Sequence, residues 1–239
     1  VDLRGGRTGT ASHIEVLVRM RNDRGELMAP GQFIPAAERY GLMNGIDRWV
    51  VTEVLQTHGA SLHRWPELTV SINLSGNSLD DPLMWPFVRD QIDQSGIDPS
   101  RIWFEITETA LVNNLVSATD FAQSAQTYGC RISLDDFGVG LSSFSYLKHF
   151  RVDELKIDGS FIQHIADDPA DLQIVRAIVS IAKVLSIETV AEWVESAEAQ
   201  EVVRKLGIDR AQGYHIGAPE PFEALCEDIG RSIEVTAAT

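Results

Sequence analysis

Short runs of β-branched and aromatic residues alternate with longer amphipathic stretches along most of this 239-residue chain. The runs predict seven strands, at residues 14–19, 68–74, 101–107, 130–135, 153–157, 187–192 and 208–212. Strands that alternate with helices form mainly parallel sheets. Seven or eight such units in a chain of this length favour an α/β fold with a closed barrel. An open doubly wound sheet is the alternative.

Two of the helical stretches have a clear apolar face. Residues 45–58 bring Ile46, Trp49, Val50 and Val54 onto one face, and residues 171–186 do the same with Ile174, Ile178, Ile181 and Leu185. Asp168-Pro169 is a start signal for the second helix. We treat residues 1–239 as a single domain, because no linker, repeat or low-complexity tract interrupts the pattern.

Composition limits the partners of the chain. The formal net charge is −15, which disfavours binding to a DNA or RNA duplex, because such binding depends on basic surfaces. No apolar run is long enough to span a membrane and no signal peptide is visible, so we expect a cytoplasmic segment without membrane contact. Cys130 and Cys226 lack metal-ligand spacing and are expected to be reduced and structural.

The strands share a feature that points to function. Each is apolar until its C-terminal end, where it carries a charged or amide residue: Asn73, Glu105, Asp135 with Asp136, Lys156, Glu192 and Gln212. In a parallel barrel the C-terminal ends of the strands meet at one mouth, so these residues should converge. Glu15 lies early in its strand, which suggests that the first strand runs antiparallel to the others.

Several carboxylates gathered at one mouth repel one another unless cations balance them. Ligands that all carry oxygen suit Mg²⁺ or Mn²⁺, and the lack of His or Cys in the pattern argues against zinc. Adjacent Asp135 and Asp136 allow one carboxylate to bridge two ions, an arrangement used for phosphodiester cleavage. Each residue alone also has a structural explanation, as a cap, a turn or a local ion pair.

Other motifs do not support a different chemistry. Asp136-Phe137-Gly138 lacks the partner motifs of a kinase, and Gly138-Val139-Gly140 is too short for a dinucleotide fingerprint. Ser142-Ser143 has no positioned histidine for a nucleophilic triad. The six histidines have no paired spacing and are interpreted as surface or structural residues.

Several segments together resemble one known family, the EAL domains. Glu15-Val16-Leu17-Val18-Arg19 is similar to the family signature Glu-Ala-Leu-x-Arg, with Val in the place of Ala. Further ordered segments resemble the following blocks of the family: PGQFIPAAERYGLMNGIDRWV, SINLSGNSL, FEITETA, LDDFGVGLSSFSYLK, LKIDGSFI, TVAEWVE and AQGYHIGAPEP. The resemblance covers nearly the whole chain. It implies a TIM-like (β/α)8 barrel with one antiparallel strand, and a phosphodiesterase that cuts cyclic di-GMP to linear pGpG with two Mg²⁺ or Mn²⁺ ions.

The resemblance also assigns a role to each candidate residue. The first ion would take Glu15, Asn73, Glu105 and Asp135, and the second Asp135, Asp136 and Glu192. Lys156 would hold or deprotonate the attacking water, with Glu15, Asp135 and Glu192 completing the catalytic set. Substrate contacts are expected from Arg19, Leu17, Asp158 and Gln212. Glu108 and Glu195 are expected to anchor loops.

The chain also departs from the family pattern. It lacks the usual N-terminal helix and the start of the first strand, residues 137–143 differ from the usual loop, and Trp193 replaces a common Gly. The resemblance implies a homodimer and an upstream sensor or GGDEF-type domain, which would allow a membrane tether in the full-length protein. Two alternatives remain: a catalytically weak or inactive cyclic di-GMP receptor, and an enolase-type barrel enzyme that abstracts a proton.

Overall fold

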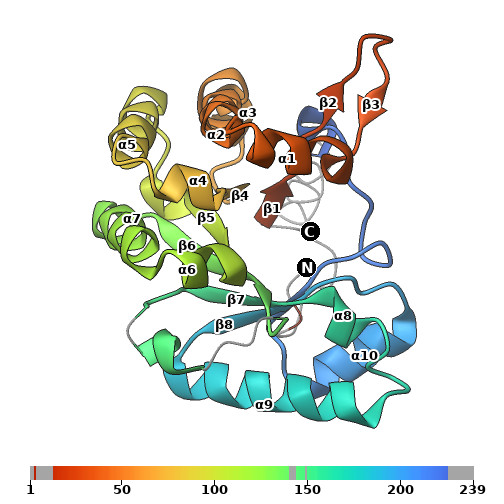
Figure 1. Cartoon of the computed structure of the whole chain (residues 1–239). Helices are drawn as coiled ribbons and strands as arrows, with labels where there is room; N and C mark the ends of the chain where they lie inside the picture. The colour runs from red at the N-terminus through yellow and green to blue at the C-terminus, as the bar shows by residue number, and fades with distance from the viewer. Residues whose placement is uncertain (1–2, 4–12, 140–143, 149, 226–239) are drawn as a thin grey trace.

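Seven parallel strands form one curled sheet in the computed structural model, which describes residues 3, 13–139, 144–148 and 150–225 (Figure 1). The strands pair in chain order: β1 (His13–Val16), β4 (Thr69–Asn73), β5 (Ile102–Thr107), β6 (Arg131–Phe137), β7 (Glu154–Ile157), β8 (Glu188–Ala191) and β9 (Arg210–Ala211). All seven strands expected from the sequence are therefore confirmed, with ends that shift by up to three residues.

The sheet curls until its two edges face each other. Gln212, which follows β9, donates a hydrogen bond of 3.1 Å from Nε2 to Glu15 Oε2 on β1. The backbone N–H of Leu3 donates to Asp209 O, next to β9, at 2.7 Å. Among the described residues, no backbone pair joins β9 to β1. The sheet is thus barrel-like, and the open doubly wound alternative is wrong.

The first strand does not run in the expected direction. β1 pairs in parallel with β4, with Glu15 beside Ser71, so the prediction of an antiparallel strand at Glu15 is wrong. That prediction took the strand as 14–19 and therefore placed Glu15 near its start. The strand instead ends at Val16, so Glu15 lies near its C-terminal end, as the site residues of the other strands do.

Helices surround the sheet on its outer face, as Figure 1 shows. They are α1 (Pro30–Arg39), α2 (Met43–Thr52), α3 (Gly59–Arg64), α4 (Gly76–Leu79), α5 (Met84–Ser95), α6 (Glu108–Asn113), α7 (Leu115–Tyr128), α8 (Gly159–Ile162), α9 (Pro169–Leu185) and α10 (Ala197–Leu206). Shorter turns are η1 (Glu53–Thr57, a π-helix), η2 (Pro99–Arg101) and η3 (Phe144–Lys148). A small hairpin, β2 (Met20–Arg21) and β3 (Leu27–Met28), projects from the barrel. Within the described part of the chain, no helix combines the length and apolarity needed to cross a bilayer.

The two helices expected from the sequence are present, with corrections to their faces. Residues 45–58 correspond to α2 and its π-helical continuation η1, but the Trp49 side chain is 54% exposed. Residues 171–186 correspond to α9, whose N-cap Asp168 accepts from Ala170 N at 2.7 Å. Ile174 is exposed, because the face of α9 that meets the sheet is centred on Ile178 and its neighbours. In both helices the apolar stripe is wider than the surface that the barrel covers.

The interior of the barrel carries two layers of polar side chains, because inward positions recur every second residue of a strand. The lower layer contains His13, Ser71, Ser133, Glu154 and Arg210. The upper layer lies two residues further along each strand and contains the predicted site residues. Apolar residues that face the helices form the surrounding core.

The two cysteines can be compared with their prediction only in part. Cys130 is buried and free, as expected of a reduced structural cysteine, and burial raises the pKa of its thiol to about 12. Cys226 lies outside the described residues, as do residues 140–143 of the loop that departs from the family pattern.

Candidate functional site

A ring of polar side chains from all seven strands forms the mouth of the barrel. Glu15, Asn73, Glu105, Asp135 and Lys156 lie at the C-terminal ends of β1, β4, β5, β6 and β7. Glu192 and Gln212 follow β8 and β9 directly. The structure thus brings together residues that are up to 197 positions apart in the sequence. The convergence expected from parallel strand ends is present.

Lys156 lies at the centre of this ring and is only 2% exposed. Its Nζ lies 2.7 Å from Glu105 Oε2 and 2.9 Å from Glu192 Oε1. Asp135 Oδ1 lies 3.0 Å away and Glu15 Oε2 3.2 Å away. One buried ammonium group therefore faces four carboxyl groups.

Amide side chains complete the ring. Asn73 donates from Nδ2 to Glu15 Oε1 at 2.9 Å, and Gln212 donates from Nε2 to Glu192 Oε1 at 2.7 Å. Both amides therefore orient the carboxylates through their NH₂ groups and leave their carbonyl oxygens for other partners.

The pKa values of the ring residues show that the negative charge of the carboxyl groups exceeds the positive charge of Lys156. Burial raises the pKa of Glu105 well above its ordinary value, and the charge of Lys156 only partly offsets this. Burial likewise raises the pKa of Glu192 to about 8. Burial alone would also raise the pKa of Glu15, but Lys156 and the hydrogen bond from Asn73 hold it below its ordinary value. The ring thus has more carboxyl groups than its own lysine can keep ionised.

A β-bulge turns two adjacent carboxylates toward the same space. The register between β6 and β7 shifts between Leu134 and Phe137, and Asp136 has a φ of 53°. Neighbouring residues of a regular strand point to opposite faces, and a bulge with one left-handed residue removes that alternation. Burial and the neighbouring Asp135 raise the pKa of Asp136 to about 6.

The donor atoms form two groups that each fit a divalent cation. Carboxylate oxygens of Glu15, Glu105 and Asp135 lie within 4.8 Å of one another, and so do those of Asp135, Asp136 and Glu192. Asp135 belongs to both groups, and its buried Oδ1 has an ion pair with Lys156 at 3.0 Å but no well-aligned hydrogen bond among the described residues. Donor sets that consist only of oxygen atoms suit hard divalent cations.

The other predicted site residues lie around the ring. Arg19 and Glu195 are exposed and line one cavity beside it, and Leu17 lines the cavities on both sides. Asp158 caps α8 by accepting from Ser160 N at 2.9 Å. It is not among the described residues that line the two cavities.

Glu108 contacts the loop that follows the bulge. Its Oε2 accepts from Gly138 N at 3.0 Å, and its Oε1 accepts from Tyr146 OH at 2.9 Å. The side chain is buried at the start of α6. Its two oxygens thus join both ends of the loop that begins after Asp135 and Asp136.

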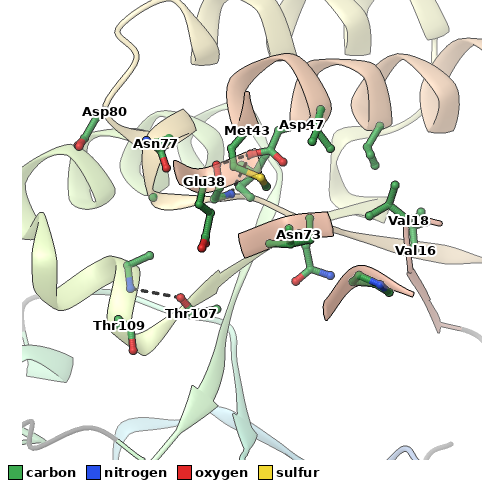
Figure 2. A pocket seen from close by; sticks show the side chains of 18 of the residues that line it. Val16, Val18, Glu38, Met43, Asp47, Asn73, Asn77, Asp80, Thr107 and Thr109 are labelled. Atoms are coloured by element: carbon green, nitrogen blue, oxygen red, sulfur yellow. Dashed lines mark hydrogen bonds between the residues drawn. The ribbon is translucent and has the colours of Figure 1, made fainter. Parts of the chain in front are cut away.

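Two cavities meet at the ring. One, of about 610 Å³, lies between β1, α1, α2, α4 and α6, and Figure 2 shows Glu38 of α1 pointing into it near Asn73 and Thr107. The other, of about 400 Å³, lies on the opposite side of Glu15 and is bordered by Arg19, Trp193 and Tyr214. Glu15 and Leu17 line both cavities. Glu15, Asn73 and Gln212 of the ring therefore border two hollows of ligand size.

Sequence reasoning missed several residues near the site. Asp47 of α2 is buried, and its Oδ2 accepts from Ser75 N, Ser75 Oγ and Ser78 Oγ at 2.6–2.9 Å. An aspartate among apolar residues of an amphipathic helix was the available signal. His13 lies below Glu15 and contacts Ser71 at 2.8 Å, and its alternation with Glu15 in one strand could have indicated an inward position.

The comparisons with known proteins agree with this geometry. Residues 4–219 match the EAL domain family. The chain is 38% identical to the cyclic di-GMP phosphodiesterases PdeB of Shewanella oneidensis and PdeF of Escherichia coli, over 94% of its length in each case. It covers only 26% and 30% of those two proteins, so it spans less than a third of their length.

Solved structures show the same fold. The PaMucR phosphodiesterase in complex with c-di-GMP is 33% identical, with a TM-score of 0.86, and the alignment covers 94% of this chain and 90% of that one. The Xanthomonas citri FimX EAL domain in complex with c-di-GMP is 28% identical, with a TM-score of 0.84, and the alignment covers 93% and 86% of the two chains. The match over nearly the whole chain, together with the ring of strand-end carboxylates, shows that this chain belongs to the EAL domain family.

Proposed function

We propose that this chain is a phosphodiesterase that hydrolyses cyclic di-GMP to linear pGpG with two Mg²⁺ or Mn²⁺ ions. The observation that carries the proposal is the pair of oxygen-only donor sets that share Asp135, one of which includes Glu15 at the border of two cavities. A cyclic dinucleotide has phosphates at its centre and two flat bases at its ends, which matches a charged ring with a hollow on each side. The names of the similar proteins point to the same substrate.

Charge balance supports two divalent cations. The five carboxyl groups of Glu15, Glu105, Asp135, Asp136 and Glu192, together with Lys156, carry a formal charge of −4 when all are ionised. Two divalent cations balance that charge. Glu15, Glu105 and Asp135, with the carbonyl oxygen of Asn73, would hold one ion, and Asp135, Asp136 and Glu192 the other. When bound, such ions lower the proton affinity of water and neutralise phosphate oxygens.

The residues of the chain would then carry out the rest of the reaction. Lys156 would hold the attacking water oxygen by a hydrogen bond and stabilise the charge that develops on the phosphate. That oxygen forms a new bond to phosphorus while the bond to the 3′ oxygen breaks, and the 3′ oxygen takes up a proton. Arg19 would clamp the phosphate from the rim, with Leu17, Asp158 and Gln212 contacting the substrate. Glu108 and Glu195 would anchor the adjoining loops.

The proposal extends to the setting of the domain. We propose that the chain acts as a homodimer in the cytoplasm and that a sensor or GGDEF-type domain regulates it in the full-length protein. Support for the last point comes from a relative of this chain, MucR of Pseudomonas aeruginosa, which is named a bifunctional diguanylate cyclase and cyclic di-GMP phosphodiesterase.

The decisive experiment is a nucleotide assay with an isosteric variant. The chain is incubated with cyclic di-GMP and Mn²⁺, Mg²⁺ or EDTA, and pGpG is measured by chromatography. Glu15→Gln should lower the rate at least 100-fold, because it removes a charged ligand from one donor set. Glu201→Gln, at a half-exposed glutamate of α10 outside the site, should leave the rate unchanged. Binding of cyclic di-GMP without release of pGpG under any metal condition would show a receptor instead of an enzyme.

A further inference from the structure

Trp193 has a backbone conformation that is unusual for its side chain. Its φ is 53°, in the left-handed region that a bulky residue rarely adopts. The chain on both sides is fixed by hydrogen bonds, from Glu192 N to Ile157 O at 3.2 Å and from Val194 N to Gln212 O at 3.0 Å. Strain that the surroundings enforce in this way is concentrated at functional sites. A glycine would remove the strain, so the indole itself needs an explanation.

The backbone that follows β9 packs against this segment and prevents it from relaxing. A Cβ at Gly213 would lie 2.3 Å from Val194 N, so the backbones after β8 and β9 are in direct contact. The left-handed turn at Trp193 is therefore a consequence of the packing that also positions Glu192 and Gln212 in the ring.

The indole lies against the backbone of a second glycine. A Cβ at Gly159 would lie 2.3 Å from Trp193 Cγ, so the first residue of α8 leaves the space in which the ring sits. The Trp193 side chain is nevertheless 56% exposed. It lines the 400 Å³ cavity together with Arg19 and Tyr214. A large aromatic surface is thus held in place on one side and open to the cavity on the other.

We propose that Trp193 is a specificity-determining residue whose indole stacks on one flat base of the substrate. This inference rests on the proposed function, because it requires a nucleotide whose phosphate lies at the ring. Glu15 belongs to the ring and also lines the cavity, so a phosphate at the ring places its adjoining base toward Trp193. Base–aromatic stacking contributes about 1–3 kcal/mol per base.

The first test measures kcat and KM for cyclic di-GMP hydrolysis. Trp193→Ala should raise KM by about 5- to 140-fold, which is the stacking contribution at about 1.4 kcal/mol per factor of ten. Its kcat should stay within about threefold, because stacking on a base remote from the reacting phosphate binds ground state and transition state alike. Trp193→Phe should keep most of the affinity. Trp49→Ala, at an equally exposed tryptophan that lines neither cavity, is the matched control and should change neither constant.

The second test moves the indole without altering it. Gly159→Ala should raise KM, because the added methyl group occupies the space of the Trp193 ring. In the Trp193→Ala background the same change should have little effect, which a double-mutant cycle measures. Gly45→Ala, in α2 with open space around it, controls for the glycine substitution.

The outcomes separate the two proposals. If the wild-type chain releases no pGpG, the proposed function fails. If it releases pGpG and Trp193→Ala leaves KM unchanged or lowers only kcat, the stacking role is overturned and the proposed function stands. Equal effects of Gly159→Ala in the two backgrounds also contradict the inference, since the methyl group would then act through something other than Trp193.

Discussion

At the scale of single residues, Lys156 compensates part of the negative charge of the site but cannot neutralise it alone. Four carboxyl groups lie within 3.2 Å of one buried ammonium group. Burial alone would lower the pKa of Lys156, but the surrounding acids raise it well above its ordinary value, so it stays charged. A buried charge is tolerated only when partners compensate it. Lys156 therefore depends on the carboxyl groups around it, and they depend on Lys156.

Replacing this lysine should therefore separate its structural and chemical roles. Lys156→Met removes the charge while filling the space, and without metal it should destabilise the fold by about 3 kcal/mol, because the carboxyl groups lose their common partner. Mn²⁺ should restore most of that stability, yet the rate should stay low. Thermal unfolding with and without Mn²⁺, together with the nucleotide assay, tests this.

An exposed lysine outside the site provides the matched control. Lys205→Met, at an exposed lysine of α10, should leave stability and rate unchanged. A Lys156→Met variant that no longer responds to Mn²⁺ would contradict a role beside the cations and indicate a ligand-positioning role instead.

The composition of the ring could be predicted from the sequence because it depends on a local rule. Polar residues at the ends of apolar strands converge whenever the strands are parallel, and this placed Asn73, Glu105 and Asp135 correctly. The sequence does not reveal backbone strain, so the left-handed turn at Trp193 was not foreseen. Nor does it reveal that the amides of Asn73 and Gln212 direct their NH₂ groups to carboxylates.

At the scale of elements, the junction between β4 and α4 depends on a carboxylate from another helix. Asp47 of α2 accepts three hydrogen bonds from Ser75 and Ser78, at the start of α4. Asn73 ends β4 two residues before this junction. The position of one ring residue is thus coupled to the packing of α2 against α4.

Loss of this carboxylate should weaken the whole junction. Asp47→Ala removes the shared acceptor of one buried and two partly buried donors, and an unsatisfied buried group costs about 1–3 kcal/mol, so we expect a loss of about 1–3 kcal/mol in urea unfolding. Asp47→Asn keeps a carbonyl acceptor and should cost less. Asp120→Ala, at an exposed position of α7, is the control. Equal stability of the Asp47→Ala and Asp120→Ala variants would rule out the coupling.

Elements were easier to predict than their ends and faces. The strands follow from β-branched runs bounded by turn residues, and α9 begins at Asp168-Pro169 as expected. The end of β1 was misplaced because Leu17 and Val18 continue the apolar run although the strand has already ended. Trp49 was placed on the apolar face of its helix but is exposed, because periodicity reports the apolar stripe of a helix and not the width of the surface that covers it.

At the scale of the whole molecule, the site links stability to pH. In the ring without cations, burial raises the pKa of Glu192 to about 8, whereas an unfolded chain holds glutamate near 4.5. Between these values the folded state binds a proton that the unfolded state lacks, so stability falls as pH rises through this window. Burial and Arg210 lower the pKa of His13 to about 3. Its protonation in the unfolded state opposes the trend below about pH 6.5.

Above about pH 6.5 the opposing contribution of His13 fades, and the raised pKa values of Glu192 and Glu105 determine the trend. Without metal, the free energy of unfolding should decrease by at least about 1 kcal/mol between about pH 6.5 and 8, because each proton that only the folded state binds is worth about 1.4 kcal/mol per pH unit. With Mn²⁺ the trend should reverse, since cations bind the deprotonated carboxylates and compete better with protons at higher pH. Urea unfolding at several pH values, with EDTA or with Mn²⁺, measures both slopes. Glu192→Gln should reduce the slope in EDTA, and a slope of unchanged size in this variant would assign the protons to groups other than Glu192.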